Sequence, residues 1–318
     1  MGRCGSVSRI AAEDHSTLSP VGPKSDFTTT AWWLLFAVAA FVCVVVIALA
    51  VGALISRRRA RKVSESEAKG FVMTFGVIIP AIVLAATFAL SVAGIAKDAK
   101  PSRPTALKIH VIGHQWWWEV RYAGSDAVTA NEIHVPVGTP VELELTSADV
   151  IHSFWVPAIM PKLDLIPGHT NTTWMTVDDA GTYRGQCAEY CGLQHAHMAF
   201  SVVAESKARF DRWLDDQASP AATPTTAEEK KGYDVFTSGS CATCHTVRGT
   251  SANGDVGPDL THLADRSSLA AETIPNDRGH LAGWVANSQR IKPGNKMPPQ
   301  PLSPADLTAV ITYLESLK

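Results

Sequence analysis

The chain has 318 residues, which is enough for two compact domains and a membrane anchor. Its net charge is −2 and only 18% of its residues are charged, so it offers no basic surface of the kind that binds nucleic acid. Nucleic acid is therefore excluded as a partner, and a large share of the 46% hydrophobic content falls in two stretches near the N-terminus.

These two apolar stretches predict membrane helices. Residues 31–55 contain no charge, and a helix of that length reaches about 37 Å, beyond the ~30 Å hydrocarbon core of a bilayer. Residues 71–96 repeat the feature and are interrupted only by Pro80, which a neighbouring helix can accommodate. We predict a transmembrane hairpin over residues 31–96 after a tail of residues 1–30. A cleaved signal peptide fits less well, because the first stretch is too long.

Basic residues cluster between the two stretches, at Arg57, Arg58, Arg59, Arg61 and Lys62. By the positive-inside rule this connection is cytoplasmic. The rule places the N-terminal tail and everything after Lys97 on the extracytoplasmic side.

Four of the six cysteines form two closely spaced pairs, Cys187 with Cys191 and Cys241 with Cys244. Cys43 lies inside the first apolar stretch, where we expect it to be an inert packing residue. Cys4 resembles a lipidated cysteine only if a signal sequence precedes it, and it stays unassigned.

Short strands are predicted over residues 105–205. Apolar and polar residues alternate over 141–146 and again over 198–203, as they do in strands with one buried face. Glycine and proline turns separate several such stretches, which favours an all-β sandwich.

A linker and a helical domain are predicted next. Residues 218–226 lack apolar periodicity and are rich in Ala, Pro and Thr, so we assign 206–226 to a flexible linker and 227–318 to an all-α domain. Ser303, Pro304 and Asp306 indicate the start of a terminal helix. Its apolar face is formed by Leu307, Val310, Ile311, Leu314 and Leu317.

Metal-binding residue types gather in one loop between two predicted strands, with one histidine further upstream: Cys187, Cys191, His195, Met198 and His152. Thiolate, thioether and imidazole ligands select copper and also admit zinc, and the thioether favours copper. The two thiolates can bridge two metal ions. His152 and Met198 would then bind one ion, whereas His195 and the carbonyl of Glu189 would bind the other.

A disulfide between Cys187 and Cys191, or a structural zinc site, is the alternative for this loop. The spacing C-x-E-x-C-x3-H-x2-M, however, resembles the binuclear copper (CuA) signature of cytochrome c oxidase subunit II. The resemblance covers about residues 20–205, including the Gly-His-Gln-Trp-Trp-Trp segment at 113–118, the first histidine motif at 149–154 and the turn at 162–168.

This resemblance implies a cupredoxin-type Greek-key sandwich. It also implies that Trp116 passes electrons into the copper and that the Glu189 side chain contacts a magnesium ion shared with subunit I. On chemistry alone, the tryptophan cluster is more typical of a membrane-interface belt or a core. One position departs from the family: Met73 stands where a glutamate often precedes the second-span proline by seven residues, so we assign no proton-uptake residue.

The sequence Cys241-Ala-Thr-Cys244-His245 is a C-x-x-C-H motif, which is typical of covalent haem c attachment with the histidine as proximal iron ligand. A zinc knuckle or a thioredoxin-like pair is the alternative, but zinc needs a second ligand pair and a redox pair needs a βαβ context, and neither is found.

The sixth iron ligand is predicted to be Met297, the only methionine after the linker. His262 and His280 could compete for the iron, although surface histidines are common. The segment resembles a small class I cytochrome c, with Gly232 and Phe236 in its first helix.

Together these motifs resemble subunit II of bacterial cytochrome c oxidases that carry a fused cytochrome c. The resemblance implies that haem c takes electrons from an upstream cytochrome c or quinol–cytochrome c reductase. CuA then passes them to subunit I, which reduces oxygen to water and pumps protons. Subunit I and other oxidase subunits are the expected partners, in a bacterial cell membrane with both domains extracytoplasmic.

Three rival functions are weighed against this one. A quinol oxidase subunit lacks the copper thiolates, so Cys187 and Cys191 count against it. A nitric oxide or nitrous oxide reductase could use CuA, yet the two-span anchor with a fused cytochrome c favours oxygen reduction. A free-standing membrane electron carrier or copper-delivery protein would need no contact with subunit I.

Overall fold

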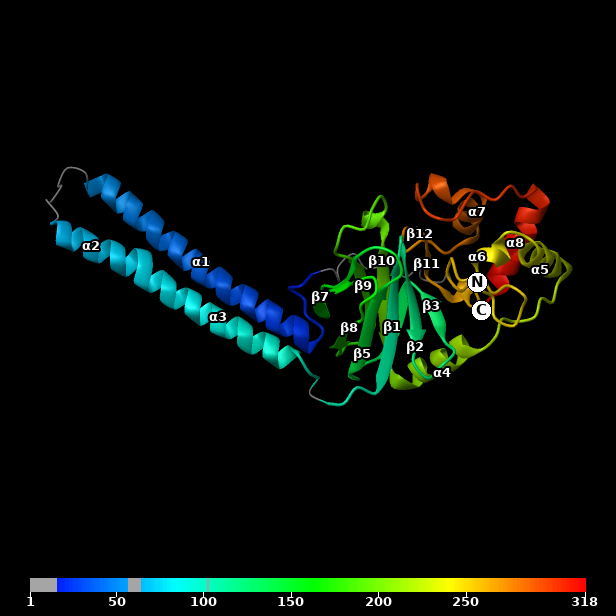
Figure 1. Ribbon diagram of the computed structural model, residues 1–318, viewed down its shortest axis with the longest axis horizontal. Helices are drawn as coiled ribbons and strands as arrows, with labels where there is room; N and C mark the ends of the chain where they lie inside the picture. The colour runs from blue at the N-terminus through cyan, green and yellow to red at the C-terminus, as the bar shows by residue number, and fades with distance from the viewer. Residues whose placement is uncertain (1–15, 57–63, 102) are drawn as a thin grey trace, which may run out of the picture. The chain divides into compact units, whose positions relative to one another are not determined.

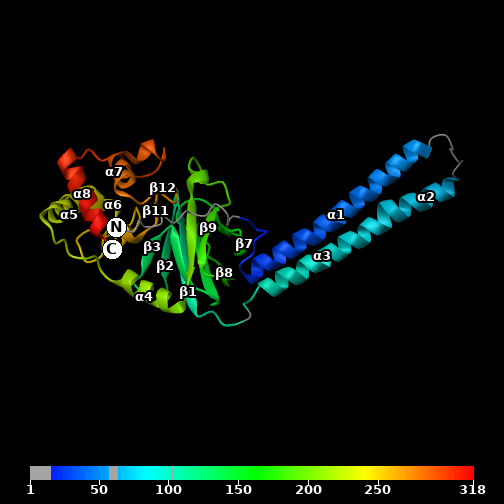
Figure 2. The same cartoon turned by 180° about the vertical axis from the view of Figure 1, so that it is seen from behind.

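The computed structural model describes residues 16–56, 64–101 and 103–318. A helical hairpin precedes a β-sandwich and a mainly helical C-terminal domain, which confirms the predicted fold class (Figures 1 and 2). The predictions for Cys4 and for the basic connection at residues 57–62 fall outside the described residues.

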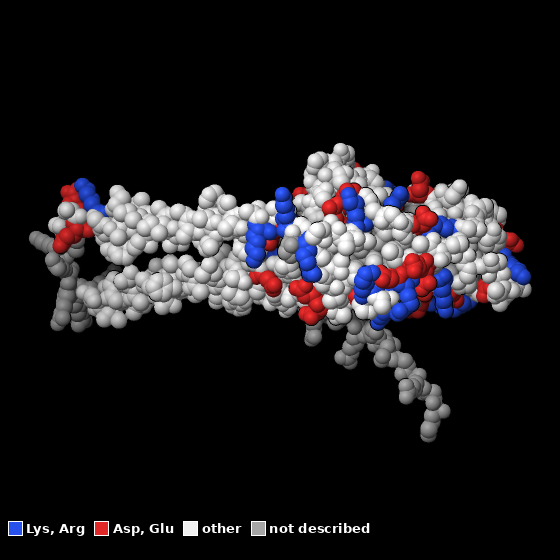
Figure 3. Space-filling model, turned by 90° about the horizontal axis from the view of Figure 1, so that it is seen from below, with Lys and Arg blue, Asp and Glu red and all other residues white. Residues whose placement is uncertain are grey.

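The hairpin has two helices that are long and apolar enough to cross a membrane, Pro23–Ile55 and Glu65–Asp98. The first is α1, and the second is built from α2 (Glu65–Met73), the π-helical η2 (Thr74–Ile78) and α3 (Ile79–Asp98). Both begin earlier than the predicted stretches 31–55 and 71–96, because a polar first turn extends each helix beyond its charge-free part; Ser64 caps the start of α2. Figure 3 shows the hairpin bare of charged side chains between its ends.

Two local features of the hairpin follow from its sequence, a π-helical turn before Pro80 and a close helix contact at Gly94. The wider π-helical turn lies directly before Pro80, and the Ile79 amide bonds to the carbonyl of Thr74, five residues back. Proline has no amide hydrogen to continue the ordinary helix pattern, so this irregularity falls where the sequence breaks that pattern. On α3, a Cβ at Gly94 would lie 1.9 Å from the ring of Phe27, so the small residue allows the two helices to approach closely.

The sandwich consists of two five-stranded sheets. In spatial order, the first contains β3 (Val128–Ala130), β2 (Trp117–Tyr122), β1 (Leu107–His114), β5 (Val141–Ser147) and β8 (Asn171–Met175). The second contains β4 (Glu132–Pro136), β10 (Ala199–Glu205), β9 (Gly181–Cys187), β6 (His152–Val156) and β7 (Met160–Leu165). Spatial neighbours are often far apart in the chain, as Greek-key connections require.

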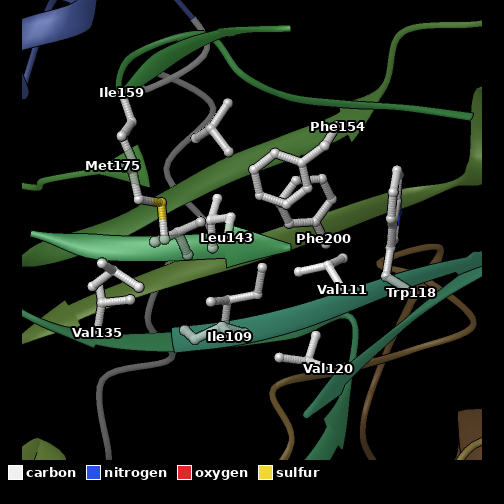
Figure 4. Close-up of a cluster of buried hydrophobic side chains, with 14 of the residues drawn as sticks. Ile109, Val111, Trp118, Val120, Val135, Leu143, Phe154, Ile159, Met175 and Phe200 are labelled. Atoms are coloured by element: carbon white, nitrogen blue, oxygen red, sulfur yellow. The ribbon is translucent and has the colours of Figure 1, made fainter. Parts of the chain in front are cut away.

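The core lies between the two sheets (Figure 4). Along β5 the apolar residues are buried at every second position, at Val141, Leu143 and Leu145, so the predicted alternation is confirmed. The rings of Phe154 and Phe200 stack with centroids 4.5 Å apart, and Trp118 packs edge-on against Phe200. Each such buried aromatic contributes about 1.5–3 kcal/mol, which stabilises the end of the sandwich that carries the predicted metal-binding loop.

The predicted linker over residues 206–226 is wrong in its first half. Lys207–Ala218 form α4, whose Phe210 is buried against the sandwich. Trp213 of the same helix stacks on His134 with ring centroids 4.0 Å apart. These aromatic residues lie among charged residues in the sequence, so no strong apolar pattern marks the helix. The packing of its aromatic side chains against the sandwich stabilises it. Only residues 219–226 remain as a connecting segment.

The C-terminal domain contains α5 (Ala227–Ser238), α6 (Cys241–Cys244), η4 (Leu263–Asp265), β11 (Ser268–Leu269), β12 (Ile274–Pro275), α7 (Arg278–Asn287), η5 (Ser288–Arg290) and α8 (Pro304–Ser316). The predicted terminal helix is α8, capped by Ser303 as expected. It crosses α5 at Gly232, where an added Cβ would lie 2.1 Å from the carbonyl oxygen of Ala309. A larger residue at this crossing would push the two helices apart.

The sandwich and the C-terminal domain are not joined by a linker alone, in contrast to the sequence-based expectation. Both belong to one compact unit. Arg248 donates to the carbonyl oxygen of Asp126 at 2.7 Å, and the amide of Ser267 donates to the buried carboxylate of Glu132 at 2.8 Å. Because these partners are more than 100 residues apart in sequence, no local pattern could reveal them.

Candidate metal centre and haem pocket

The predicted copper ligands meet at one end of the sandwich. Cys187 ends β9 and Met198 directly precedes β10, so the loop between these two strands carries the motif. His195 begins the short helix η3 (His195–His197) in the same loop. Strand β6 pairs with β9 and places Phe154 opposite Cys187, which brings His152 at the start of β6 to the loop.

The potential ligand atoms have the spacing of a metal centre. Cys187 Sγ lies 3.8 Å from Cys191 Sγ and 3.9 Å from His152 Nδ1. Cys191 Sγ lies 3.6 Å from His195 Nδ1 and 3.8 Å from Met198 Sδ. Two atoms that each bind one metal at about 2.2 Å with a tetrahedral angle are roughly 3.6 Å apart. The sulfur atoms are therefore placed to share metal ions with both imidazoles and the thioether.

Cys187 and Cys191 are free, buried thiols. Their separation far exceeds the ~2.05 Å of a disulfide bond. The hydrogen bond between the two sulfur atoms lowers the pKa of the Cys187 thiol and raises the pKa of Cys191. The carbonyl oxygen of Glu189 lies 3.2 Å from Cys187 Sγ, beside the sulfur pair. The pair thus forms a soft donor set with a carbonyl at its edge, which suits copper.

Asp149 orients the buried imidazole of His152, a role that the sequence did not indicate. Its Oδ1 lies 2.9 Å from His152 Nε2, which leaves Nδ1 facing Cys187. Burial works to raise the pKa of Asp149, but hydrogen bonds from His152 and from the amides of Val150 and Gln115 outweigh it and hold the pKa well below its usual range. The one sequence feature that could have indicated this contact is the short separation of three residues between Asp149 and His152.

Trp116 lies against the cysteine loop. Its indole Nε1 donates to the carbonyl oxygen of Cys191 at 3.0 Å, and Gln115 Nε2 donates to the same oxygen at 2.7 Å. Gly192 follows with φ of +119°, and a Cβ there would lie 3.1 Å from both side chains. The loop can therefore approach Trp116 only because glycine stands at this position.

The C-x-x-C-H motif opens onto a cavity of about 270 Å³ in the C-terminal domain. Cys241, Cys244 and His245 line it, and His245 Nδ1 lies 2.8 Å from the carbonyl oxygen of Pro258. Burial lowers the pKa of His245 and favours the neutral imidazole that iron requires. A Cβ at Gly257 would lie 2.6 Å from the imidazole, so glycine leaves room for the ring. Apolar walls, paired thiols and an oriented imidazole together fit a covalently bound haem.

Met297 also lines the cavity, while the two competing histidines are engaged elsewhere. His262 Nε2 is 2.9 Å from the carbonyl oxygen of Ser219, and His280 Nδ1 is 2.7 Å from the carboxylate of Asp277. Neither histidine is among the described residues that line the cavity. The structure therefore favours Met297 as the sixth ligand.

Family models match two parts of the chain. Residues 126–206 match "Cytochrome C oxidase subunit II, periplasmic domain", and residues 229–318 match "Cytochrome c".

Several curated relatives are similar over much of their length. Cytochrome c oxidase subunit 2 of Alkalihalophilus pseudofirmus is 34% identical, over 97% of this chain and 92% of the relative. The subunit 2 of Bacillus sp. strain PS3 is 31% identical, over 73% of this chain and 68% of the relative. Among solved structures, the periplasmic domain of oxidase subunit II of Bradyrhizobium japonicum is 31% identical, with a TM-score of 0.34 over 36% of this chain and 95% of that one.

Proposed function

Because this chain belongs to the cytochrome c oxidase subunit II family and carries a cytochrome c domain, we propose that it relays electrons from its own haem c through CuA to subunit I. Its relatives are subunit 2 of cytochrome c oxidases. A bound haem c and a binuclear copper centre would each supply one-electron redox chemistry. Oxygen reduction to water, with coupled proton pumping, would take place in subunit I.

In this proposal the chain's own side chains divide into two ligand sets. The copper set comprises His152, Cys187, Glu189 through its carbonyl, Cys191, His195 and Met198. The haem set comprises Cys241, Cys244, His245 and Met297. Asp149 orients His152, and the backbone around Pro258 orients His245.

The observation that carries the proposal is the position of Trp116. Trp116 borders the haem cavity, and its indole donates a hydrogen bond to the backbone of Cys191, a proposed copper ligand. Trp116 is therefore in contact with the surroundings of both ligand sets, and we propose that it serves electron transfer between them. The indole is only 8% exposed, which excludes most water from this contact.

Magnesium and the partner subunits belong to the same proposal. The side chain of Glu189 is half exposed and lies 3.7 Å from Lys162 Nζ, so a carboxylate is available at the surface for a magnesium ion shared with subunit I. We propose subunit I and other oxidase subunits as stable partners. An upstream cytochrome c or quinol–cytochrome c reductase would donate electrons to the haem.

The rival functions lack comparable support. A quinol oxidase subunit would not need the two buried thiols that face the imidazoles at Cys187 and Cys191. A free-standing carrier or copper-delivery protein would have no need of a haem cavity bordered by Gln115 and Trp116, two residues that bond to the copper loop. A nitrogen-oxide reductase could use the same copper set, so the terminal acceptor has to be measured.

The relay is tested by photoreducing haem c in the purified oxidase and following both centres. We expect loss of the reduced-haem band to coincide with bleaching of the copper near-infrared band, followed by oxygen consumption. Metal analysis of the same sample should give two copper ions for each haem c in addition to the copper that subunit I of a haem-copper oxidase holds. Haem oxidation without any change at copper would contradict the relay.

The chain is proposed to lie in a bacterial cell membrane with both domains outside. A reporter inserted in the connection between the two spans should be labelled from the cytoplasm, and one fused after Lys318 should be labelled from outside. A hairpin with two spans has both ends on one side of the membrane. A reporter placed before Pro23 therefore serves as the matched control and should be labelled from the same side as the reporter after Lys318. The opposite labelling would overturn the assignment of sides.

A further inference from the structure

A short segment of the C-terminal domain, residues 292–297, runs along the copper loop. We call it the bridging segment. At its start, Lys292 donates into the loop, and next to it the carbonyl oxygen of Pro293 accepts from Gln194 Nε2 at 2.7 Å. At its end, Lys296 lies 3.2 Å from Asp149 and adjoins Met297, which lines the haem cavity. The bridging segment thus connects the haem cavity to the copper loop.

Lys292 has the most enclosed position in this segment, with a relative exposure of 2%. Lysines ordinarily leave their ammonium group in water, but here Nζ donates to three carbonyl oxygens. Those of Trp116, His197 and Ala270 lie at 2.8, 2.6 and 3.0 Å. An ammonium has three N–H donors and no acceptor, so the three oxygens match the charged form.

Burial acts against that charge and lowers the pKa of Lys292 to about 7, while a negative charge on Cys191 would act to raise it. The three carbonyl dipoles point their negative ends at Nζ and also favour the ammonium. The ammonium group of Lys292 is therefore held in one position by its three hydrogen bonds, unlike a solvated charge on the surface.

The three accepting residues belong to three different parts of the two sites. Trp116 borders the haem cavity and bonds to the copper loop, and His197 lies between the proposed ligands His195 and Met198. Ala270 belongs to the cavity wall. Lys292 therefore joins the tryptophan backbone, the copper loop and the haem wall at one nitrogen atom.

The wall of the haem cavity around Ala270 has an unfavourable backbone conformation, which the contact with Lys292 helps to hold. Ala270, Ala271 and Glu272 all have φ between 55° and 60°, a left-handed conformation that is unfavourable for residues with a Cβ. The sandwich holds this run at two further points. Ala271 accepts a hydrogen bond from the amide of Ala199, and the carboxylate of Glu272 bonds to Ser201 and Arg184.

We propose that Lys292 is a positioning residue for electron transfer between the haem and the copper centre, because it fixes Trp116, the copper loop and the haem wall relative to one another. The inference rests on the proposed function. The step that it serves moves one electron from ferrous haem to the oxidised copper pair, and no bond forms or breaks.

The test uses the complete oxidase with Lys292→Met, which keeps the length of the side chain and removes its three donors. After photoreduction of haem c, we expect electron transfer to copper to slow about tenfold or more, because small misplacements of reacting groups have large effects on rate. Haem attachment and copper content should match the parent protein. Lys231→Met is the matched control, since this lysine pairs with Asp306 on the surface of the same domain; its rate should be unchanged.

The reduction potentials of both centres are titrated in the same samples. They show whether a slower transfer comes from misplaced groups or from a smaller difference in potential between haem and copper. An unchanged rate in Lys292→Met, or a slower rate that the measured potentials fully explain, would overturn the proposal. If the methionine variant loses a centre, Lys292→Gln, which keeps two donors, is measured instead under the same criteria. Loss of a centre in both variants would also overturn it, since Lys292 would then serve assembly. Absence of haem-to-copper transfer in the parent protein would instead reject the proposed function.

Discussion

Replacing Cys191 with serine is expected to abolish the binuclear copper spectrum while haem c stays covalently attached. Cys191 Sγ is within 3.8 Å of Cys187, His195 and Met198, so its loss removes the atom that all three share. A serine hydroxyl is a hard, protonated donor and cannot replace a bridging thiolate for copper. The haem thiols, Cys241 and Cys244, belong to a different cavity. Metal analysis and near-infrared spectra of the purified protein measure the effect.

Cys43→Ser is the matched control for this change. Cys43 is an exposed residue of the apolar helix α1, outside the cysteine loop, and its replacement should leave both spectra intact. A full copper spectrum in Cys191→Ser would refute the assignment of this thiol as a bridge. Loss of haem together with copper would show that the substitution disturbs the whole unit rather than one site.

Met297→His is expected to keep the haem attached and to lower its reduction potential strongly. Imidazole is a stronger donor than thioether and favours ferric iron, and axial ligands set haem potentials over a range of about 0.8 V. The Met297 backbone is held by Ser288, which donates to its carbonyl at 2.6 Å, so the new side chain starts from a fixed position at the cavity. Redox titration of the haem band in the complete protein gives the measurement.

His280→Gln serves as the control for Met297→His. His280 is exposed on α7 and engaged by Asp277, so its replacement should leave the potential where it is. If His280 or His262 were the sixth ligand, changing Met297 would leave the potential unaltered and changing that histidine would shift it. The electron transfer to copper should persist in Met297→His, whereas reduction by the upstream donor should slow.

Features that depend on neighbouring residues were predictable from the sequence. The alternation along β5 places Leu143 in the core because successive side chains of a strand point to opposite faces. The residues predicted to bind copper from Cys187 to Met198 were also found from the sequence pattern, since they lie within one tight connection. The haem motif required only three local residues. In each case the chemistry is fixed by short separations along the chain.

Features that depend on packing were missed. Helix α4 was assigned to a linker because its few apolar residues, among them Phe210, acquire meaning only against the sandwich. The ion pair between Lys296 and Asp149 joins residues that are 147 positions apart in the sequence. Lys292 and Trp116 are 176 residues apart, so their contact follows from the docking of two domains. Sequence patterns contain no signal for such contacts.

The polar interface that holds the C-terminal domain against the sandwich, through pairs such as Ser267 with Glu132, changes the kinetic order of the proposed relay. A donor fused and docked in this way reacts at a fixed effective concentration, so each transfer to copper is first order and independent of how dilute the oxidase is. Diffusional encounter then limits only the earlier step, in which the haem is reduced. Ionic strength should accordingly alter that earlier step and leave the internal transfer unaffected.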